Sequence, residues 1–307
     1  MTRYRTVRRW AAAGVIVLVG CAAPRTAPSP DEAGGQTASP SPSVSAPSAE
    51  PHIRFAAVGD IGDGSPNETA VADAIAAAHA EEPIDLLLLL GDLIYQRGRP
   101  EQYEQRFATP YKKVLDANIP IAAVLGNHDI FTDTEGVMRA FGMPSRFYTI
   151  TRKHVQFLAL DNSKGVIDRV QRKWMLDELA RSDAPWKVAF MHFPAFSSGK
   201  NGSTPQVEQT IVEPFREHGV QLALAGHDHD YQRTHPLGGI TTYIVSGGGC
   251  CPHPPAPVAD FHAKRADGLH FLLLEVEGDR MALEAITPEG EFLDLHEIRL
   301  TAARDAA

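Results

Sequence analysis

The chain has 307 residues, 43% hydrophobic content and a formal net charge of −9 at pH 7, so it can bury one large core or two modest ones. An acidic chain is repelled by nucleic-acid backbones, and we therefore expect no nucleic-acid partner. With only 3 cysteines, the protein is not a disulfide-based scaffold.

The first twenty residues are typical of an export signal rather than of a folded core. Four arginines precede an apolar run, residues 11–19, that is too short to span a bilayer. Residues 18–21, Leu-Val-Gly-Cys, look like a bacterial lipobox, so we expect a lipoprotein-type signal peptide over 1–20 and a lipid on Cys21. Alternatives are a plain signal peptide with an incidental cysteine and twin-arginine export. Losing the four arginines would change the formal charge from −9 to −13.

A segment rich in Pro, Ser, Ala and Gly follows the signal. Residues 21–51 contain almost no large apolar side chain, so we predict a disordered tether there and a folded domain over 52–307. The expected location is the bacterial cell envelope, with the lipid anchored to the outer side of the cytoplasmic membrane; secretion is the alternative. The sequence does not fix the oligomeric state.

Strand-like and helix-like segments alternate from Ile53 onward, which predicts an α/β domain. Short apolar runs predict strands at residues 53–59, 86–90, 119–125, 186–191, 220–225 and 240–245. Helices are expected at residues 66–80, 101–118, 168–181 and 205–218, the third with Trp174, Leu176 and Leu179 facing inward. A hairpin over 146–160 and alternating strands over 269–300 complete the prediction. The expected fold is a four-layer α/β/β/α sandwich with two mixed β-sheets flanked by helices.

Five of the predicted strand ends carry side chains that can bind metals: Asp60; Asp92 with Tyr95; Asn127 with His128; His192; and His227 with His229. Each taken alone is more often a turn, cap or structural residue. Parallel strands bring their carboxyl ends to the same side of a sheet, so we expect these residues to converge on one crevice.

The types of side chain indicate two metal ions. Carboxylates, an amide oxygen, a phenol and imidazoles, without a thiol, suit borderline-to-hard cations. His227 and His229, two apart on an extended stretch, would lie about 6.6 Å from each other and could serve one metal each. Two ions about 3.5 to 4 Å apart need a bridging carboxylate, and Asp92 on the central strand is the natural bridge.

The order of these motifs resembles a known family. Asp60-Ile61-Gly62, then GDLIY, GNHD, His192 and GHDHDYQR look like the calcineurin-like metallophosphoesterases and, within them, the purple acid phosphatases. Ordinary members have a metal-binding His at the position of Gly62; here Tyr95 offers the missing ligand, as in the purple acid phosphatases. With no room for a further domain before Ile53, the resemblance is to a short, single-domain bacterial lipoprotein form.

This resemblance implies a ligand set and a mechanism. Asp60, Asp92, Tyr95 and His229 would hold Fe(III), and a divalent zinc, iron or manganese ion would bind Asp92, Asn127, His192 and His227. A phosphate monoester would be hydrolysed by attack of a metal-bound hydroxide. His128 would protonate the leaving group; the alternative is that it only orients Asp92 or Asn127. We expect Asp129 to fix His128.

Two rival functions share these motifs. The same dinuclear site could act on phosphodiesters, because the motifs fix the metals and not the pocket that selects the ester. A metal- or phosphate-binding lipoprotein without turnover is the other rival, and it is disfavoured because no ligand position is degenerate. Arg233 could hold a substrate phosphate, although a structural ion pair is favoured. Lys200, in a polar loop after His192, is expected to be surface.

The pair Cys250-Cys251 begins a proline-rich insertion, residues 250–262. Adjacent Cα atoms lie about 3.8 Å apart, so a bond between these cysteines would be strained. The sequence leaves open two unpaired thiols, a vicinal disulfide, or a soft-metal site with His253 or His262.

Overall fold

The computed structural model of this chain describes residues 51–255 and 257–300. The predicted signal peptide, the lipidation site Cys21 and all but the last residue of the predicted tether lie outside the described residues. No helix within the described residues combines the length and the apolar character that crossing a membrane requires.

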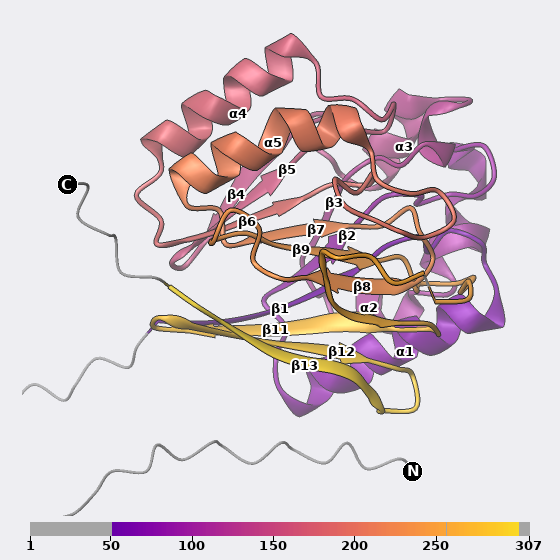
Figure 1. The fold of residues 1–307 in the computed structure, drawn as a ribbon. Helices are drawn as coiled ribbons and strands as arrows, with labels where there is room; N and C mark the ends of the chain where they lie inside the picture. The colour runs from indigo at the N-terminus through magenta and orange to yellow at the C-terminus, as the bar shows by residue number, and fades with distance from the viewer. Residues whose placement is uncertain (1–50, 256, 301–307) are drawn as a thin grey trace, which may run out of the picture. The chain divides into compact units, whose positions relative to one another are not determined.

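Two β-sheets form the centre of the domain (Figure 1). The six-stranded sheet has the order β13-β12-β11-β1-β2-β3. Its members are β1 (His52–Val58), β2 (Leu86–Leu89), β3 (Ile121–Ala123), β11 (Phe271–Glu277), β12 (Arg280–Ile286) and β13 (Phe292–Arg299). Strands β1, β2 and β3 are parallel, and β11 joins them by pairing antiparallel with β1.

The seven-stranded sheet has the order β10-β8-β9-β7-β6-β5-β4. Its members are β4 (Tyr148–Arg152), β5 (Val155–Ala159), β6 (Trp186–Phe190), β7 (Leu222–Ala225), β8 (Tyr231–Thr234), β9 (Thr242–Ser246) and β10 (His262–Ala266). Strands β5, β6, β7 and β9 are parallel, and the others pair antiparallel at the two edges. Strands β8 and β10 are absent from the sequence-based prediction.

Helices cover the outer faces of both sheets. Beside the six-stranded sheet lie α1 (Pro66–Glu81), the short turns η1 (Pro100–Gln102) and η2 (Glu104–Ala108), α2 (Lys112–Asp116) and α3 (Thr134–Ala140), and η3 (His128–Ile130) follows β3. Beside the seven-stranded sheet lie α4 (Arg169–Arg181) and α5 (Pro205–His218), above it in Figure 1. The predicted four-layer α/β/β/α fold is confirmed.

Three apolar cores explain the layering. The first lies between the sheets and contains Phe55 and Leu88 from one and Phe157 and Phe190 from the other. The second and third lie between each sheet and its helices. Strands β1, β2, β5, β6 and β7 are buried along almost their whole length because each of their two faces meets one of these cores.

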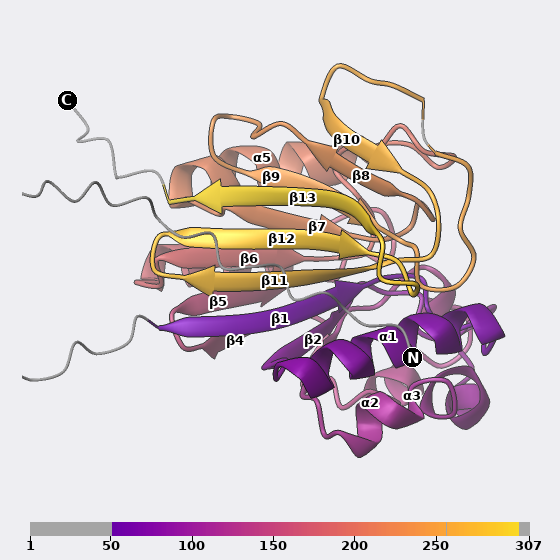
Figure 2. The same ribbon diagram turned by 90° about the horizontal axis from the view of Figure 1, so that it is seen from below.

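The antiparallel strands β11, β12 and β13 differ from the parallel ones. In Figure 2 they face the viewer, and the helices cover only the side of the sheet formed by β1, β2 and β3. Their burial alternates along β12 and β13, as expected for strands with one solvated face. The parallel strands of both sheets end on the same side of the sandwich, toward the right in Figure 1, which positions the loops that follow them.

Candidate metal centre

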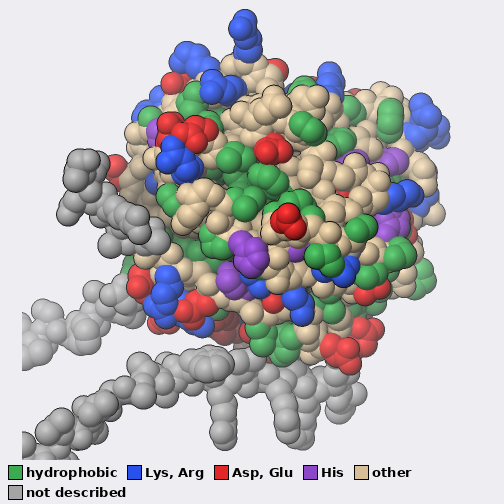
Figure 3. All heavy atoms as spheres, viewed as in Figure 1, with side chains coloured by type: hydrophobic (Ala, Val, Ile, Leu, Met, Phe, Trp, Pro, Cys, Tyr) green, Lys and Arg blue, Asp and Glu red, His purple; other side chains and the backbone are tan. Residues whose placement is uncertain are grey.

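The structure brings together all seven predicted ligands. They follow β1 (Asp60), β2 (Asp92 and Tyr95), β3 (Asn127), β6 (His192) and β7 (His227 and His229). In Figure 3, drawn in the orientation of Figure 1, histidine side chains show in several places on this face, including a group at the right-hand side, toward which the parallel strands run. The ligands form two groups that meet at Asp92.

The first cluster is a triangle of three atoms. Tyr95 Oη lies 3.1 Å from Asp60 Oδ1 and 3.2 Å from His229 Nε2. The third side, from His229 Nε2 to Asp60 Oδ1, is 3.3 Å. Asp60 is fully buried and Tyr95 nearly so. A carboxylate, a phenol and an imidazole therefore present their ligand atoms to one point.

The second cluster surrounds His192 Nε2. Asn127 Oδ1 lies 3.1 Å away, His227 Nδ1 3.3 Å and Asp92 Oδ1 3.4 Å. His192 and Asp92 are buried. Asp92 also lies close to the first cluster, because ligand atoms of Asp60, Asp92 and His192 all lie within 4.8 Å of one another. One carboxylate thus lies between the two clusters, as a bridging ligand must.

Backbone carbonyls fix the orientation of two of the imidazoles. His192 Nδ1 donates to Leu90 O at 2.9 Å, and His229 Nδ1 donates to Cys251 O at 2.8 Å. A carbonyl only accepts, so each Nδ1 carries a hydrogen and each Nε2 is left to face its cluster. This arrangement, in which the far ring nitrogen is held by a carbonyl, is the usual one for histidines that bind metals.

The donor set fits a cation on physical grounds. His192 Nε2 faces an amide oxygen and a carboxylate oxygen at 3.1 and 3.4 Å. When the imidazole is neutral, its Nε2 carries a lone pair, as both oxygens do. Lone pairs converge at such distances only when a proton or a metal ion lies among them.

Backbone strain is concentrated at three ligands. Asp60, Asp92 and His227 have φ angles of 60°, 53° and 74°, in the left-handed region that non-glycine residues rarely adopt. Surrounding bonds hold them there: Asp60 N donates to Gly91 O, and His227 N donates to Asp60 Oδ2. Strain of this kind typically persists where a functional site requires it.

By the resemblance described above, ordinary members of the family would carry a histidine at the position of Gly62. A Cβ atom there would lie 2.1 Å from Leu93 O, and the Gly62 carbonyl accepts from Tyr95 N at 2.7 Å. No side chain fits at this position without moving the loop that carries Tyr95. The structure therefore shows why Tyr95, and not residue 62, reaches the first cluster.

Charge interactions shift the pKa values of the cluster residues in the metal-free protein. Burial would raise the pKa of Asp60, but His229 and other imidazoles lower it to about 2. Burial would lower the pKa of His229, but Asp60 raises it to about 9. Burial, and then His192, lower the pKa of His227 to about 3. His227 is therefore neutral at ordinary pH and has a lone pair available for a cation.

The comparisons with known proteins agree with this geometry. The family model for calcineurin-like phosphoesterase matches residues 53–231, which span every ligand above. The chain belongs to the calcineurin-like phosphoesterase family. It is therefore a hydrolase of phosphoric esters.

Relatives within this family are acid phosphatases. The chain is 26% identical to human tartrate-resistant acid phosphatase type 5 over 295 residues, which cover 80% of this chain and 90% of the human protein. It is 25% identical to purple acid phosphatase 3 of Arabidopsis thaliana, with 64% and 63% covered.

Two solved structures have the same fold. A purple acid phosphatase from yellow lupin seeds superposes with a TM-score of 0.71 at 20% identity, covering 81% of this chain and 54% of that one. The Plasmodium protein GAP50, an anchor in the inner membrane complex, has a TM-score of 0.72 at 15% identity, with 82% and 90% covered.

His128 lies at the edge of the phosphoesterase site. Its backbone N–H donates to Asp92 Oδ1 at 2.9 Å, and its Nδ1 donates to Gln96 O at 2.7 Å. The remaining ring nitrogen, Nε2, lies 3.9 Å from Asp92 Oδ2 on a side chain that is 29% exposed. The backbone of His128 orients Asp92, and its partly exposed side chain places Nε2 near the same carboxylate.

Asp129 does not fix His128, contrary to our expectation. Its carboxylate accepts hydrogen bonds from the backbone N–H groups of Leu93, Ile94 and Gly126. The residue is fully buried. It holds the loop after β2 against the loop after β3, and so sets the position of Asp92 relative to Asn127.

Sequence reasoning missed Asn162, which follows β5. Its Oδ1 accepts from the backbone N–H groups of His192 and Phe193 at 3.0 and 2.9 Å, and its Nδ2 donates to Phe193 O. The side chain is fully buried. It positions the backbone of His192 and is not itself one of the candidate ligands. Its place just past an apolar strand is the same signal that identified those ligands, so it could have been found.

Arg233 and Cys250-Cys251 have structural partners. Arg233 pairs with Asp294 of β13, with Nε 2.6 Å from Oδ2, so the structural reading of this arginine is confirmed. The two cysteines form a disulfide, the second of the three possibilities. His262 bonds to Gln232.

Proposed function

We propose that the protein is an exported, purple acid phosphatase-like enzyme that hydrolyses phosphate monoesters with two metal ions. The observation that carries the proposal is the pair of ligand clusters that meet at Asp92, each with atoms 3.1 to 3.4 Å apart. Relatives over most of the chain are named acid phosphatases, which supports a monoester substrate.

The chemistry of the donors suggests which ion each cluster takes. We assign Fe(III) to Asp60, Asp92, Tyr95 and His229, and a divalent zinc, iron or manganese ion to Asp92, Asn127, His192 and His227. Burial, and the charges of Asp60 and Asp92, raise the pKa of Tyr95 far above its ordinary value. A phenolate forms there only with a strong Lewis acid, and a hard trivalent ion is the strongest candidate.

The protein's own residues carry the remaining chemistry. When bound, two cations supply hydroxide near neutral pH and neutralise charge on the phosphate oxygens. His128 Nε2 lies beside the shared carboxylate on a partly exposed side chain, and we assign it the proton given to the leaving oxygen. The carbonyl of Gln96 holds His128 Nδ1 and leaves Nε2 as the nitrogen that faces the substrate.

Export and anchoring are proposed from the sequence. The four arginines, the apolar run and the lipobox-like Leu-Val-Gly-Cys favour attachment to the outer side of the cytoplasmic membrane through Cys21. With a tether over residues 21–51, the catalytic domain would reach soluble phosphate esters beyond the membrane.

Elemental analysis of the purified protein, with hydrolysis of an aryl monoester and its diester, tests the proposal. We expect two metal ions per chain and faster turnover of the monoester. Faster turnover of the diester would favour the phosphodiesterase alternative. Metal-loaded protein that bound phosphate tightly but hydrolysed neither ester would favour a binding lipoprotein.

A further inference from the structure

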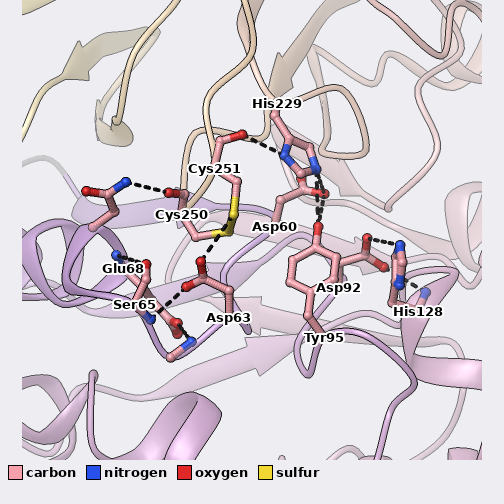
Figure 4. Close-up of a disulfide and its surroundings, with 12 residues drawn as sticks. Asp60, Asp63, Ser65, Glu68, Asp92, Tyr95, His128, His229, Cys250 and Cys251 are labelled. Carbon is pink, nitrogen blue, oxygen red and sulfur yellow. Dashed lines mark hydrogen bonds and ion pairs between the residues drawn. A yellow bond between two sulfur atoms is a disulfide. The ribbon is translucent and has the colours of Figure 1, made fainter.

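A short segment after β9, residues 249–253, packs against the first cluster and bonds to His229. We call this segment the strap. Gly249 N donates to Gly59 O at 3.1 Å, which ties the strap to the end of β1. Asn67 Nδ2 donates to Cys250 O at 3.1 Å, which ties it to α1. Figure 4 shows the strap passing between α1 and His229, with the disulfide at its centre.

Three strap contacts converge on His229. Its Nδ1 donates to Cys251 O at 2.8 Å, and its carbonyl accepts from His253 N at 2.8 Å. The His253 ring stacks on the His229 ring with centroids 4.5 Å apart and planes 5° apart. The strap thus sets the tilt of the His229 ring, its tautomer and the position of its backbone. Of the two ring nitrogens, only Nε2 faces Asp60 and Tyr95.

The disulfide closes a small ring within the strap. Cys250 and Cys251 are adjacent, so the bond restricts the peptide that joins them, and Cys251 carries the carbonyl that holds His229. Cys250 is buried, whereas Cys251 is partly exposed. Of the two sulfur atoms, that of Cys251 therefore belongs to the more exposed residue, and we expect a dissolved thiol to attack there.

Asp63 provides a partner for the reduced form. Its Oδ2 lies 3.2 Å from Cys251 Sγ, and a thiol at that sulfur would donate a hydrogen bond to it. The carboxylate of Asp63 is oriented by Ser65 N, which donates to its Oδ1 at 2.8 Å. Both redox forms of the strap therefore have local support, which a switching element requires.

We propose that the strap is the positioning element for His229 and that the redox state of Cys250-Cys251 sets how firmly the first cluster holds its ion. A dithiol attacks Cys251 Sγ, the S–S bond breaks, and Cys250 leaves as a thiolate that takes a proton. The second sulfur of the dithiol displaces Cys251, which also leaves as a thiol. Two electrons pass to the strap, and the dithiol becomes a disulfide. The claim about the ion rests on the proposed function, whereas the claim about His229 does not.

The first test uses metal-free protein in a Cys21→Ser background, so that only the strap cysteines can react. A phosphine reductant opens the disulfide, and alkylation with mass spectrometry confirms the opening. We expect faster hydrogen exchange at the His253 amide and a changed ¹⁵N signal of His229 Nδ1. Unchanged exchange and an unchanged imidazole signal would overturn the proposal, whatever the enzyme hydrolyses.

The second test follows metal retention during a chelator challenge. Outer-shell partners of ligating histidines change metal affinity by about 10- to 100-fold, so reduction should speed loss of one ion by about 10-fold or more. The double variant Cys250→Ser/Cys251→Ser should lose the ion as fast as the wild-type protein with its disulfide reduced. Adding phosphine should not change the rate for this variant. A phosphine effect in that variant would place the redox sensitivity at the metal instead and overturn the proposal.

His253→Ala provides a matched control, because it removes the ring stack and keeps the disulfide. We expect it to weaken metal retention while remaining sensitive to phosphine. If the serine variant does not fold, the oxidised and reduced forms of the Cys21→Ser protein still decide the question. If the oxidised and reduced forms lost the ion at the same rate, the proposal would be wrong.

Discussion

His192 donates its Nδ1 hydrogen to the carbonyl oxygen of Leu90 at 2.9 Å, across the interface between the two sheets. His192 follows β6 of one sheet and Leu90 follows β2 of the other. The bond does two things at once: it joins the sheets at their carboxyl ends, and it turns Nε2 of the imidazole toward Asp92 and Asn127. The packing of the sandwich therefore assembles the candidate metal site.

Tyr95→Phe should abolish any visible phenolate-to-iron absorption band while the second ion stays bound. Tyr95 Oη belongs to the first cluster only, 3.1 Å from Asp60 Oδ1. Absorption spectroscopy with elemental analysis is the measurement. Tyr103→Phe, at a half-buried phenol that packs on Phe107, is the matched control and should keep the band. An unchanged spectrum in Tyr95→Phe would contradict the assignment.

His128→Ala should slow esters with poor leaving groups by about 10²- to 10⁴-fold, the usual contribution of a general acid. Activated aryl esters, which need little protonation, should be affected much less. The side chain is partly exposed, and its Nε2 atom lies 3.9 Å from Asp92 Oδ2. The measurement is kcat/KM over a series of leaving groups, and equal slowing across the series would leave His128 with an orienting role only.

Asp294→Ala should destabilise the domain by about 3 to 5 kcal/mol, because it leaves the buried guanidinium of Arg233 without its partner. Tyr231 Oη, which donates to Asp294 at 2.8 Å, also loses its acceptor. Asp279→Ala breaks an exposed pair with Arg299 and should cost under about 1 kcal/mol. Urea unfolding of metal-free protein measures both, and similar losses would refute the argument.

Glu68→Gln should reduce the loss of stability as the pH rises. Burial raises the pKa of Glu68 from 4.5 to about 10, and its Oε1 has no hydrogen-bond partner. Because the folded state binds this proton more tightly, its stabilising effect is complete below pH 4.5 and declines as pH rises toward 10. The Glu68→Gln variant keeps an acceptor for Gly64 N and carries no charge at this position.

Thermal and urea unfolding of metal-free protein between pH 5 and 9 measures this effect. Relative to wild type, Glu68→Gln should gain about 1.4 kcal/mol of stability for each pH unit between the two pKa values, which is on the order of 5 kcal/mol between pH 5 and 9. The exposed Glu289→Gln should change little with pH. A gain of the same size in Glu289→Gln would show that the pH dependence does not come from Glu68.

Cys21→Ser should release the protein from membranes into the soluble fraction, because the lipid would be attached at this sulfur. Fractionation of cells that produce the protein, with detection by antibody, is the measurement. Hydrolysis per molecule should not change, since Cys21 lies outside the predicted catalytic domain. Persistent membrane association would count against lipidation.

The helix α4 shows where reading periodicity fell short. Its apolar pattern predicted that Trp174, Leu176 and Leu179 face inward, but the buried positions are Gln171, Met175 and Leu179. Gln171 is buried because its amide exchanges two hydrogen bonds with the backbone of Asp161, both 2.7 Å long. Trp174 instead packs on Phe147 at the edge of the core. The face of α4 that is buried includes a polar residue, Gln171, which is held by hydrogen bonds. Apolar periodicity counts only apolar residues and therefore predicts a different face.

Strand β8 shows a second limit. Its residues, Tyr231 to Thr234, are mostly polar and yet all buried. They are stabilised by partners that are distant in sequence, such as Asp294. A strand whose burial depends on such pairs has no apolar alternation, so no local pattern predicts it.

The sequence by itself determined the fold class, the strands whose carboxyl ends carry the site and the seven candidate ligand residues. These follow from apolar runs and from polar residues placed at strand ends, which are local properties. Only the tertiary structure decided that the Asp129 carboxylate bonds to backbone N–H groups and not to the His128 ring. It also decided that Gly62 has no room for a side chain and that the strap sets the orientation of His229. Those outcomes depend on contacts between segments far apart in the chain, and their distances are fixed only when the two sheets pack together.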